Sequence, residues 1–399
     1  MISIFVSMLL FKPLFDIISI LNGLLNQFYI ALLCFVVFFS FFNNKISRRD
    51  MIALLSVFFF LFYSYINSKD PTAYIVDGLR LFMFVLIVIF TCNYKITNIL
   101  NAKINKNYFI IQISLVLYTI IVFVSSFRKE MYDRLLFGEP SFRFIYQNSH
   151  TLAYSLILLI FLASLLIAYR RNTIINSIVV FVNIYLLALS AARSAMIFVV
   201  LVLVALSFLF IKKKKSKILL FTLTSVVVLL IFMSPHFIGN SIIYKLPVFS
   251  KTKMLFDAGT SIYSGRDIFW EKDIKYFISS NITNKILGSG MDITYNLHSE
   301  AYGMKIWAHS DFLQLLLCNG IFGLAVYIFL LYRLYSAFYS VSGRFFGATL
   351  ILSVSLLSMT NGFFQYTSAI LSIQILYMIC LKKESCDNDE TYRPPYNIL

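Results

Sequence analysis

The sequence predicts an all-α integral membrane protein that crosses the bilayer many times. Of its 399 residues, 60% are hydrophobic and only 13% are charged, and the mean hydropathy is +0.83. This composition lies far from that of a water-soluble domain. Apolar runs alternate with short basic clusters, and the runs have the length of roughly 20 residues that a helix needs to cross the hydrocarbon core. Only residues 236–311 form a connection too long for a simple loop.

The apolar runs predict about twelve transmembrane helices. The first run lacks the small-residue cleavage site of a signal peptide but contains Lys12, Pro13 and Asp16. It is either a retained span or an interfacial segment, so eleven spans are the alternative. The predicted spans are residues 2–22, 27–43, 51–67, 73–92, 108–127, 149–169, 173–190, 195–211, 218–235, 312–332, 345–361 and 365–381.

The lysine and arginine residues predict the orientation. If residues 44–50 are cytoplasmic, alternation places five more basic segments on that side, and the six segments together hold 17 Lys and Arg residues. The three short loops opposite hold only Lys69 and Arg193. This distribution obeys the positive-inside rule and predicts that both termini are cytoplasmic. Topology therefore explains most of the net charge of +16, and no nucleic-acid partner is expected.

This topology divides the chain into four regions. Residues 1–127 hold the N-terminal transmembrane helices, and residues 128–235 hold the central ones together with an outward loop at 128–148. Residues 236–311 form the long outward loop, and residues 312–399 form the C-terminal transmembrane helices and a short cytoplasmic tail. The long outward loop is the part of the chain with room for a site outside the bilayer.

The cysteines and histidines limit the chemistry. All five cysteines fall inside predicted spans or on the cytoplasmic side, so no disulfide is expected in an outward loop. The sequence has no CxxC pair, zinc-type spacing or DxD motif, and we expect neither a metal nor a cofactor. All four histidines lie at or beyond the outward face, which places the expected function there. They are His150, His236, His298 and His309.

His309 stands directly before a long apolar run. Asp311 and Gln314 form a pair of the capping-box type, which predicts a helix N-terminus immediately after the histidine. The N-terminus of a helix attracts anions and favours the neutral form of a nearby imidazole. A neutral imidazole is what a general base for a hydroxyl group requires. The alternative is an interfacial histidine that only caps the helix or forms hydrogen bonds.

Arg193 and Arg266 are candidate ligands for an anionic group. Arg193 lies between two apolar runs, where a charge is costly unless it is paired, and its guanidinium could bind a phosphate arriving from the lipid. Snorkelling to the interface is the alternative. Arg266 precedes Trp270 by four residues, which suits a short helix lying on the membrane. For Arg266 the alternative is a salt bridge to Asp267 or Glu271.

Asp77 and Arg80 form a charged pair within one predicted span. Their i, i+3 spacing places them on the same helix face, where the two charges can neutralise each other. An ionisable pair inside the membrane is a candidate functional site, and helix packing is the equally strong alternative.

Four stretches together resemble one family. "SAARSAMIFVVLVL", "SGRDIFWE", "ILGSGMD" and "AHSDFLQLLLCNGIFGL", in this order and topology, resemble the O-antigen polymerase and O-antigen ligase family of bacterial cell envelopes. The similarity extends over roughly residues 135–335, and "FGEPSFRFIYQNSHTLAY" shares it. Ser310 and Cys318 stand where the family commonly has Asn and Glu.

The resemblance implies a glycosyltransferase of the bacterial inner membrane that acts on its periplasmic face and uses undecaprenyl-diphosphate-linked glycans. It implies that Arg193 and Arg266 bind the diphosphate and that His309 is the base, with inversion at the sugar and no metal. His298, Arg143 and Lys305 are further candidates for substrate contact. A chain-length regulator protein is the expected protein partner.

The acceptor distinguishes the enzymes of this family. A polymerase transfers the glycan to another lipid-linked repeat unit, whereas a ligase transfers it to the lipid A core. The loose motif match favours a polymerase, because repeat units vary between strains. A flippase of lipid-linked sugars is the alternative from another class, but it predicts internal repeats and short outward loops.

Overall fold

The computed structural model describes residues 2–19, 23–41, 47–133, 140–146, 148–210, 266–303 and 305–387. A short antiparallel pair of strands, β1 (Tyr132–Asp133) and β2 (Ser141–Phe142), accompanies the helices. The described helices are α1 (Ile2–Ser19), α2 (Gly23–Ser40), α3 (Arg48–Asn67), α4 (Pro71–Cys92), α5 (Tyr94–Lys106), α6 (Tyr108–Ser125), α7 (Ser149–Ala168), α8 (Thr173–Leu189), α9 (Arg193–Phe210), α12 (Arg266–Ser279), α13 (Ile282–Leu287), α14 (Ile293–Tyr302), α15 (Asp311–Thr360) and α16 (Thr367–Asp387).

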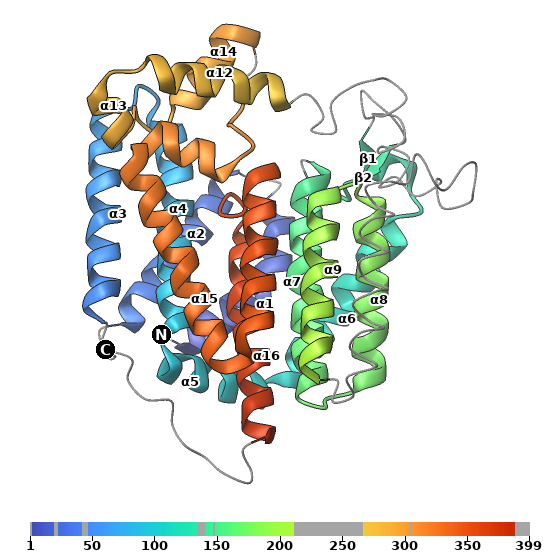
Figure 1. Ribbon diagram of the computed structural model, residues 1–399. Coiled ribbons are helices and arrows are strands. Elements are labelled where there is room, and N and C mark those ends of the chain that lie inside the picture. Colours follow the sequence, from blue (N-terminus) through green and yellow to red (C-terminus); the bar gives the residue numbers. More distant parts are fainter. Residues whose placement is uncertain are drawn as a thin grey trace.

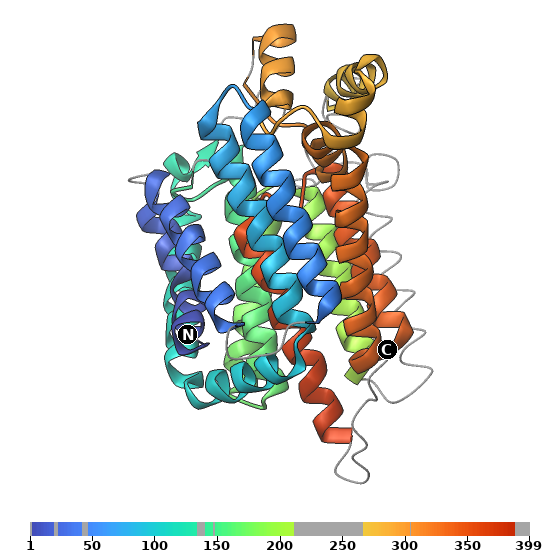
Figure 2. The same cartoon turned by 90° about the vertical axis from the view of Figure 1, so that its left-hand side faces the viewer.

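The long helices stand side by side in one bundle, as Figure 1 shows. Helices α12, α13 and α14 lie across one end of the bundle, and α5 lies at the other end. Figure 2 shows the same order from the side. Among the described helices, six are long and apolar enough to cross a membrane, and they lie in α3, α4, α6, α7, α9 and α15. The predicted all-α polytopic membrane fold is confirmed.

Eleven of the twelve predicted spans coincide with described helices, although their boundaries shift by a few residues. The predicted span 218–235, residues 236–265 of the long loop and His236 lie outside the described residues. The rest of the long loop forms α12, α13 and α14, so the expectation of short helices over the outward end holds there.

Helix α5 was not predicted, because its residues read as a basic cytoplasmic connection. Ile96, Leu100 and Ile104 are buried and recur every four residues, which gives the segment one apolar helical face. The side chain of Asn93 accepts a hydrogen bond from the N–H of Ile96 and caps the first turn. The same lysines that mark the cytoplasmic side therefore belong to an amphipathic helix.

Two glycines divide α15 into three pieces. Gly320 has φ 68° and Gly343 has φ 82°, values that only glycine adopts readily. At Gly343 the chain turns back on itself. The rings of Phe338 and Phe346, which lie before and after Gly343 in the sequence, are therefore only 5.7 Å apart. The prediction that one span begins at residue 312 is therefore wrong in detail. Residues 311–319 form a separate helical piece, and the long helix starts after Gly320.

The break at Gly320 explains the motif "ILGSGMD". A broken helix leaves carbonyl groups without a partner in the next turn. The N–H of Ser289 donates to the carbonyl of Leu317 (2.9 Å), and the N–H of Gly290 donates to that of Cys318 (3.2 Å). A Cβ atom at Gly288, where φ is 90°, would lie 2.1 Å from the Cys318 carbonyl oxygen. The motif therefore joins the outward helices to the break in α15.

We expect Gly288→Ala to destabilise the protein strongly, because it adds a backbone clash to an unfavourable φ. The expected cost is roughly 3 kcal/mol or more. Gly303→Ala is the matched control, since Gly303 also has positive φ (68°) but nothing lies within 4 Å of an added Cβ. The control should cost about 1 kcal/mol. Thermal unfolding in detergent measures both variants, and equal losses would contradict the close approach of the two backbones.

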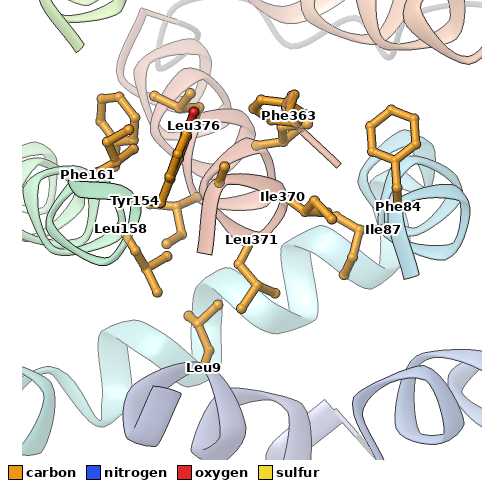
Figure 3. Close-up of a cluster of buried hydrophobic side chains, with 14 of the residues drawn as sticks. Leu9, Phe84, Ile87, Tyr154, Leu158, Phe161, Phe363, Ile370, Leu371 and Leu376 are labelled. Carbon is orange, nitrogen blue, oxygen red and sulfur yellow. The ribbon is translucent and has the colours of Figure 1, made fainter. Parts of the chain in front are cut away.

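Helix α16 forms the centre of the bundle and packs against α7 and α4. Figure 3 shows Ile370 and Leu371 of α16 between Leu158 of α7 and Ile87 of α4. These side chains are fully buried or nearly so. Since residues 367–381 of α16 are buried on all sides, the turn that leads into this helix is held rigidly at its end of the bundle.

Candidate active site

His309 lies in the segment between α14 and α15, at the end of the bundle that α12, α13 and α14 cover. Its backbone has φ 53°, an unusual value for a residue with a side chain. Its ring lies 4.8 Å from the ring of Trp307. Its Nδ1 atom is enclosed and has no hydrogen-bond partner among the described residues. A strained residue with an unpaired buried nitrogen is typical of a functional site.

The chain on either side of His309 is held by hydrogen bonds. The Trp270 Nε1–H donates to the carbonyl of Ala308 (2.8 Å), and the N–H of Ala308 donates to Gln314 Oε1 (3.2 Å). The sequence placed Trp270 on a short helix lying on the membrane. The Trp270 indole joins this helix, α12, to the segment that carries His309, which gives its N–H a partner.

Arg266 begins α12 and reaches the turn between α15 and α16. Its Nη1 donates to the carbonyl of Thr360 and its Nη2 to Asn361 Oδ1 (3.1 Å). The salt bridge considered from the sequence is not formed within the described chain, where Glu271 pairs with Lys275 instead. The C-terminal carbonyls of a helix attract a cation, which explains why the guanidinium rests there. Its positive charge has no carboxylate partner among the described residues.

Arg193 begins α9 directly after a tight turn in which Ala191 has φ 55°. The charge of Arg266 acts on both Arg193 and His309. The structure therefore brings together three residues that lie far apart in the sequence. The two arginines repel each other, and an anion between them would relieve that repulsion.

The environment of His309 holds the imidazole in its neutral form. Burial, together with the charges of Arg266 and His298, lowers the pKa of His309 to about 3. Burial also lowers the pKa of Arg266, since both groups lose water that would solvate their charges. The imidazole is therefore uncharged across the physiological pH range, and the same low pKa makes it a weak base in the protein without substrate.

We expect a histidine NMR titration to show His309 uncharged from about pH 8 down to about pH 4, because only the acid range near its lowered pKa protonates it. An ordinary histidine has a pKa of 6.5. Comparison with a His309→Gln sample assigns the signal. A titration midpoint near 6.5 for His309 would contradict the enclosed site.

Asp311 does not cap α15 as predicted. Ser310 is the N-cap residue, and the carboxylate of Asp311 accepts hydrogen bonds from the N–H groups of Phe363 (2.5 Å) and Phe364 (3.2 Å). Gln314, the second member of the predicted pair, also accepts a hydrogen bond from the hydroxyl of Thr294 (2.9 Å). The predicted capping pair thus connects the His309 segment to the turn before α16 and to α14.

The other predicted substrate contacts lie elsewhere. His298 is fully buried, with Nε2 3.0 Å from Asp273 Oδ1 and Nδ1 3.0 Å from the carbonyl of Ile306, so both ring nitrogens are used within the protein. Lys305 forms an ion pair with Asp70. Arg143 forms an ion pair with Asp133 at 3.0 Å and also lines a cavity.

Asp77 and Arg80 form the expected ion pair, with 3.2 Å between Asp77 Oδ1 and Arg80 Nη1. The hydroxyl of Tyr295 donates to Asp77 Oδ2 (2.9 Å), and Arg80 donates to Gln365 Oε1 (2.8 Å). The pair therefore links α4 to α14 and to the turn before α16, which favours the packing interpretation over an isolated intramembrane site.

Three residues near the arginines were missed from the sequence. Asn361 donates to the hydroxyl of Tyr154 (3.0 Å), and the rings of Tyr154 and Tyr366 are stacked 3.7 Å apart. Tyrosines at span ends are ordinary in membrane proteins, so they gave no signal. The polar run "TNGFFQ" could have drawn attention to Asn361, since amides at an outward turn are candidate ligands. Within the described chain, no group of acidic, His and Cys residues suits a metal ion.

Comparison with known proteins gives a family match over this part of the chain. Residues 178–328 match the family model described as O-antigen ligase. The match contains Arg193, Arg266 and His309, and it confirms the resemblance to O-antigen polymerases and ligases. The chain is a multi-pass membrane protein in which residues 178–328 are similar to O-antigen ligases. None of the curated proteins compared with the chain matches it.

Proposed function

We propose that the protein is an O-antigen polymerase, which joins undecaprenyl-diphosphate-linked repeat units at the periplasmic face of the inner membrane. The observation that carries this proposal is Arg266, a guanidinium held at the end of α15 without a carboxylate partner in the described chain, beside the neutral His309. A site of this kind suits an anionic leaving group and an acceptor that must lose a proton.

The arginines would stabilise the leaving diphosphate. When the bond between the anomeric carbon and the diphosphate oxygen breaks, negative charge develops on that oxygen. Fixed guanidinium groups stabilise such a charge more in a site that is partly shielded from water than in bulk water. Arg193 and Arg266 come from different elements, α9 and α12, so they could hold the diphosphate from two sides.

His309 would take the proton of the acceptor hydroxyl as the oxygen attacks the anomeric carbon. One carbon–oxygen bond forms while the bond to the diphosphate breaks, and direct attack inverts the configuration. The charge of Arg266 contributes to the low pKa of His309. A bound diphosphate would offset that charge and raise the pKa, so the base becomes stronger when the donor is present.

The lipopolysaccharide profile of a deletion strain tests the assignment. A polymerase is expected to leave core carrying one repeat unit, because single units are still exported and ligated. The wild-type chain should restore the ladder. Bare core in the deletion strain would instead indicate a ligase or an exporter.

A further inference from the structure

A cavity of about 590 Å³ lies beside the candidate active site, within the size range of about 300–1,000 Å³ typical of ligand pockets. Helices α1, α2, α4, α7 and α16 and the β2–α7 connection contribute to it. The charged residues that line it are all cationic, namely Lys12, Arg80 and Arg143. The remaining polar lining consists of amides and hydroxyls, with several aromatic rings. Amides, hydroxyls and aromatic faces are the groups that hydrogen-bond and stack on sugars.

Two amides of this cavity have atoms without a partner. Asn26 Oδ1 and Gln365 Nε2 are enclosed and form no hydrogen bond among the described residues. Gln365 is only 6% exposed, and its Oε1 is already used by Arg80. Enclosed polar atoms without partners are costly unless a ligand or water satisfies them. An enclosed acceptor and an enclosed donor, the latter near the carboxylate of Asp77, are therefore available to a polar ligand.

An aromatic wall separates the cavity from the arginines of the active site. Trp307, Tyr154 and Tyr366 line the cavity. On the other side, Trp307 contacts His309, and Tyr154 receives a hydrogen bond from the Asn361 that also holds Arg266. Of the catalytic candidates, His309 contacts the wall residue Trp307 directly, whereas Arg266 is linked to Tyr154 through Asn361. Neither Arg193 nor Arg266 lines the cavity.

We propose that this cavity binds the acceptor glycan and that the acceptor carries an acidic group. This inference rests on the proposed function and assigns the second substrate of that reaction. The acceptor is the substrate that loses its proton to His309, so it must lie on the histidine side of the site, whereas the diphosphate requires the arginines. Arg80 and Arg143 form ion pairs with Asp77 and Asp133, but neither carboxylate lines the cavity, so the charged groups that face it are cations. An acidic sugar, carrying a carboxylate or a phosphate, is the class of glycan that such a lining would select.

Equilibrium binding of an acceptor glycan to the protein tests whether the cavity is the acceptor site. The probe is a radiolabelled repeat unit from the host strain, joined to its lipid through a link that cannot be cleaved, so that it can only accept. Gln27→Trp fills the cavity and should raise the dissociation constant of the probe at least tenfold. Phe28→Trp is the matched control, because Phe28 is the next residue of α2 and is 62% exposed on the outer surface of the bundle. Its binding should be unchanged.

Equal affinity in the Gln27→Trp variant would overturn the location. Binding requires no turnover, so this outcome is separate from failure of the proposed function, which wild type would reveal by forming no glycosidic bond from intact lipid-linked units. A rise in the dissociation constant for the donor alone would also overturn the assignment to the acceptor.

The acidic class has its own test. Arg143→Gln should weaken binding of the native probe at least fivefold, but should not change binding of a probe whose acidic groups have been reduced or removed. Asp133→Asn is the control, because it breaks the ion pair of Arg143 and keeps the cation. The claim that the acceptor is acidic would be overturned if the repeat unit of the host carried no acidic substituents. It would also be overturned if wild type bound both probes equally.

Discussion

Replacing His309 with alanine is expected to lower glycan transfer by about 10²–10⁴-fold, the usual contribution of a general base. The imidazole is enclosed, neutral and strained in a segment that other side chains hold in place. Its removal takes away the proton acceptor and leaves the arginines in position. The measurement is turnover of purified protein in lipid nanodiscs, at matched amounts of folded protein.

His298→Ala is the contrasting variant for this experiment. The ring of His298 is buried and bridges Asp273 and the Ile306 carbonyl, so its loss should lower the melting temperature. Protein that remains folded should keep most of its turnover, because His298 does not contact the reacting groups in this account. Turnover of His309→Ala above a tenth of wild type would remove the histidine from the chemistry.

Arg266→Gln is expected to lower kcat by about 10²–10³-fold, the effect of removing one group that stabilises a developing negative charge. Glutamine keeps a neutral N–H donor of shorter reach in place of the guanidinium that bonds to Thr360 and Asn361, so the charge is lost. Arg266→Lys should restore only part of the activity, because an ammonium cannot bind a phosphate in the bidentate manner of a guanidinium.

Lys275→Gln provides the control on the same helix. Lys275 pairs with Glu271 on the exposed side of α12, where an ion pair contributes little. Its kcat should equal that of wild type. If Lys275→Gln and Arg266→Gln reduced kcat equally, the effect would come from α12 as a whole rather than from the charge at the active site.

The transmembrane helices were predictable because the bilayer imposes a length and an apolar composition on each span. The sequence also marked Arg193 and His309, since charged or titratable residues are scarce in the short loops on the outward side of the predicted spans. Arg266 was marked by its place beside Trp270 in the long loop and by the family resemblance. Their convergence could not be deduced from periodicity. It depends on how α9, α12 and the segment before α15 are packed together.

Several misjudged details share one physical cause. Asp311, Gln314 and Trp270 carry groups that can cap a local helix or anchor in an interface, and a sequence shows only those local partners. In the structure they bond to Phe363, Thr294 and Ala308, which are distant in sequence or in another element. The break at Gly320 was missed for the same reason, because its backbone partners are supplied by residues 289 and 290.

The most direct test of the central claim is a reaction containing only the purified protein in nanodiscs and the intact lipid-linked repeat unit of its host. We expect glycans of two or more repeat units to form, with release of undecaprenyl diphosphate and without addition of lipopolysaccharide core. A product that appears only when core is added would contradict the polymerase assignment and identify a ligase. Failure to form any glycosidic bond under either condition would contradict the proposed glycosyltransferase activity.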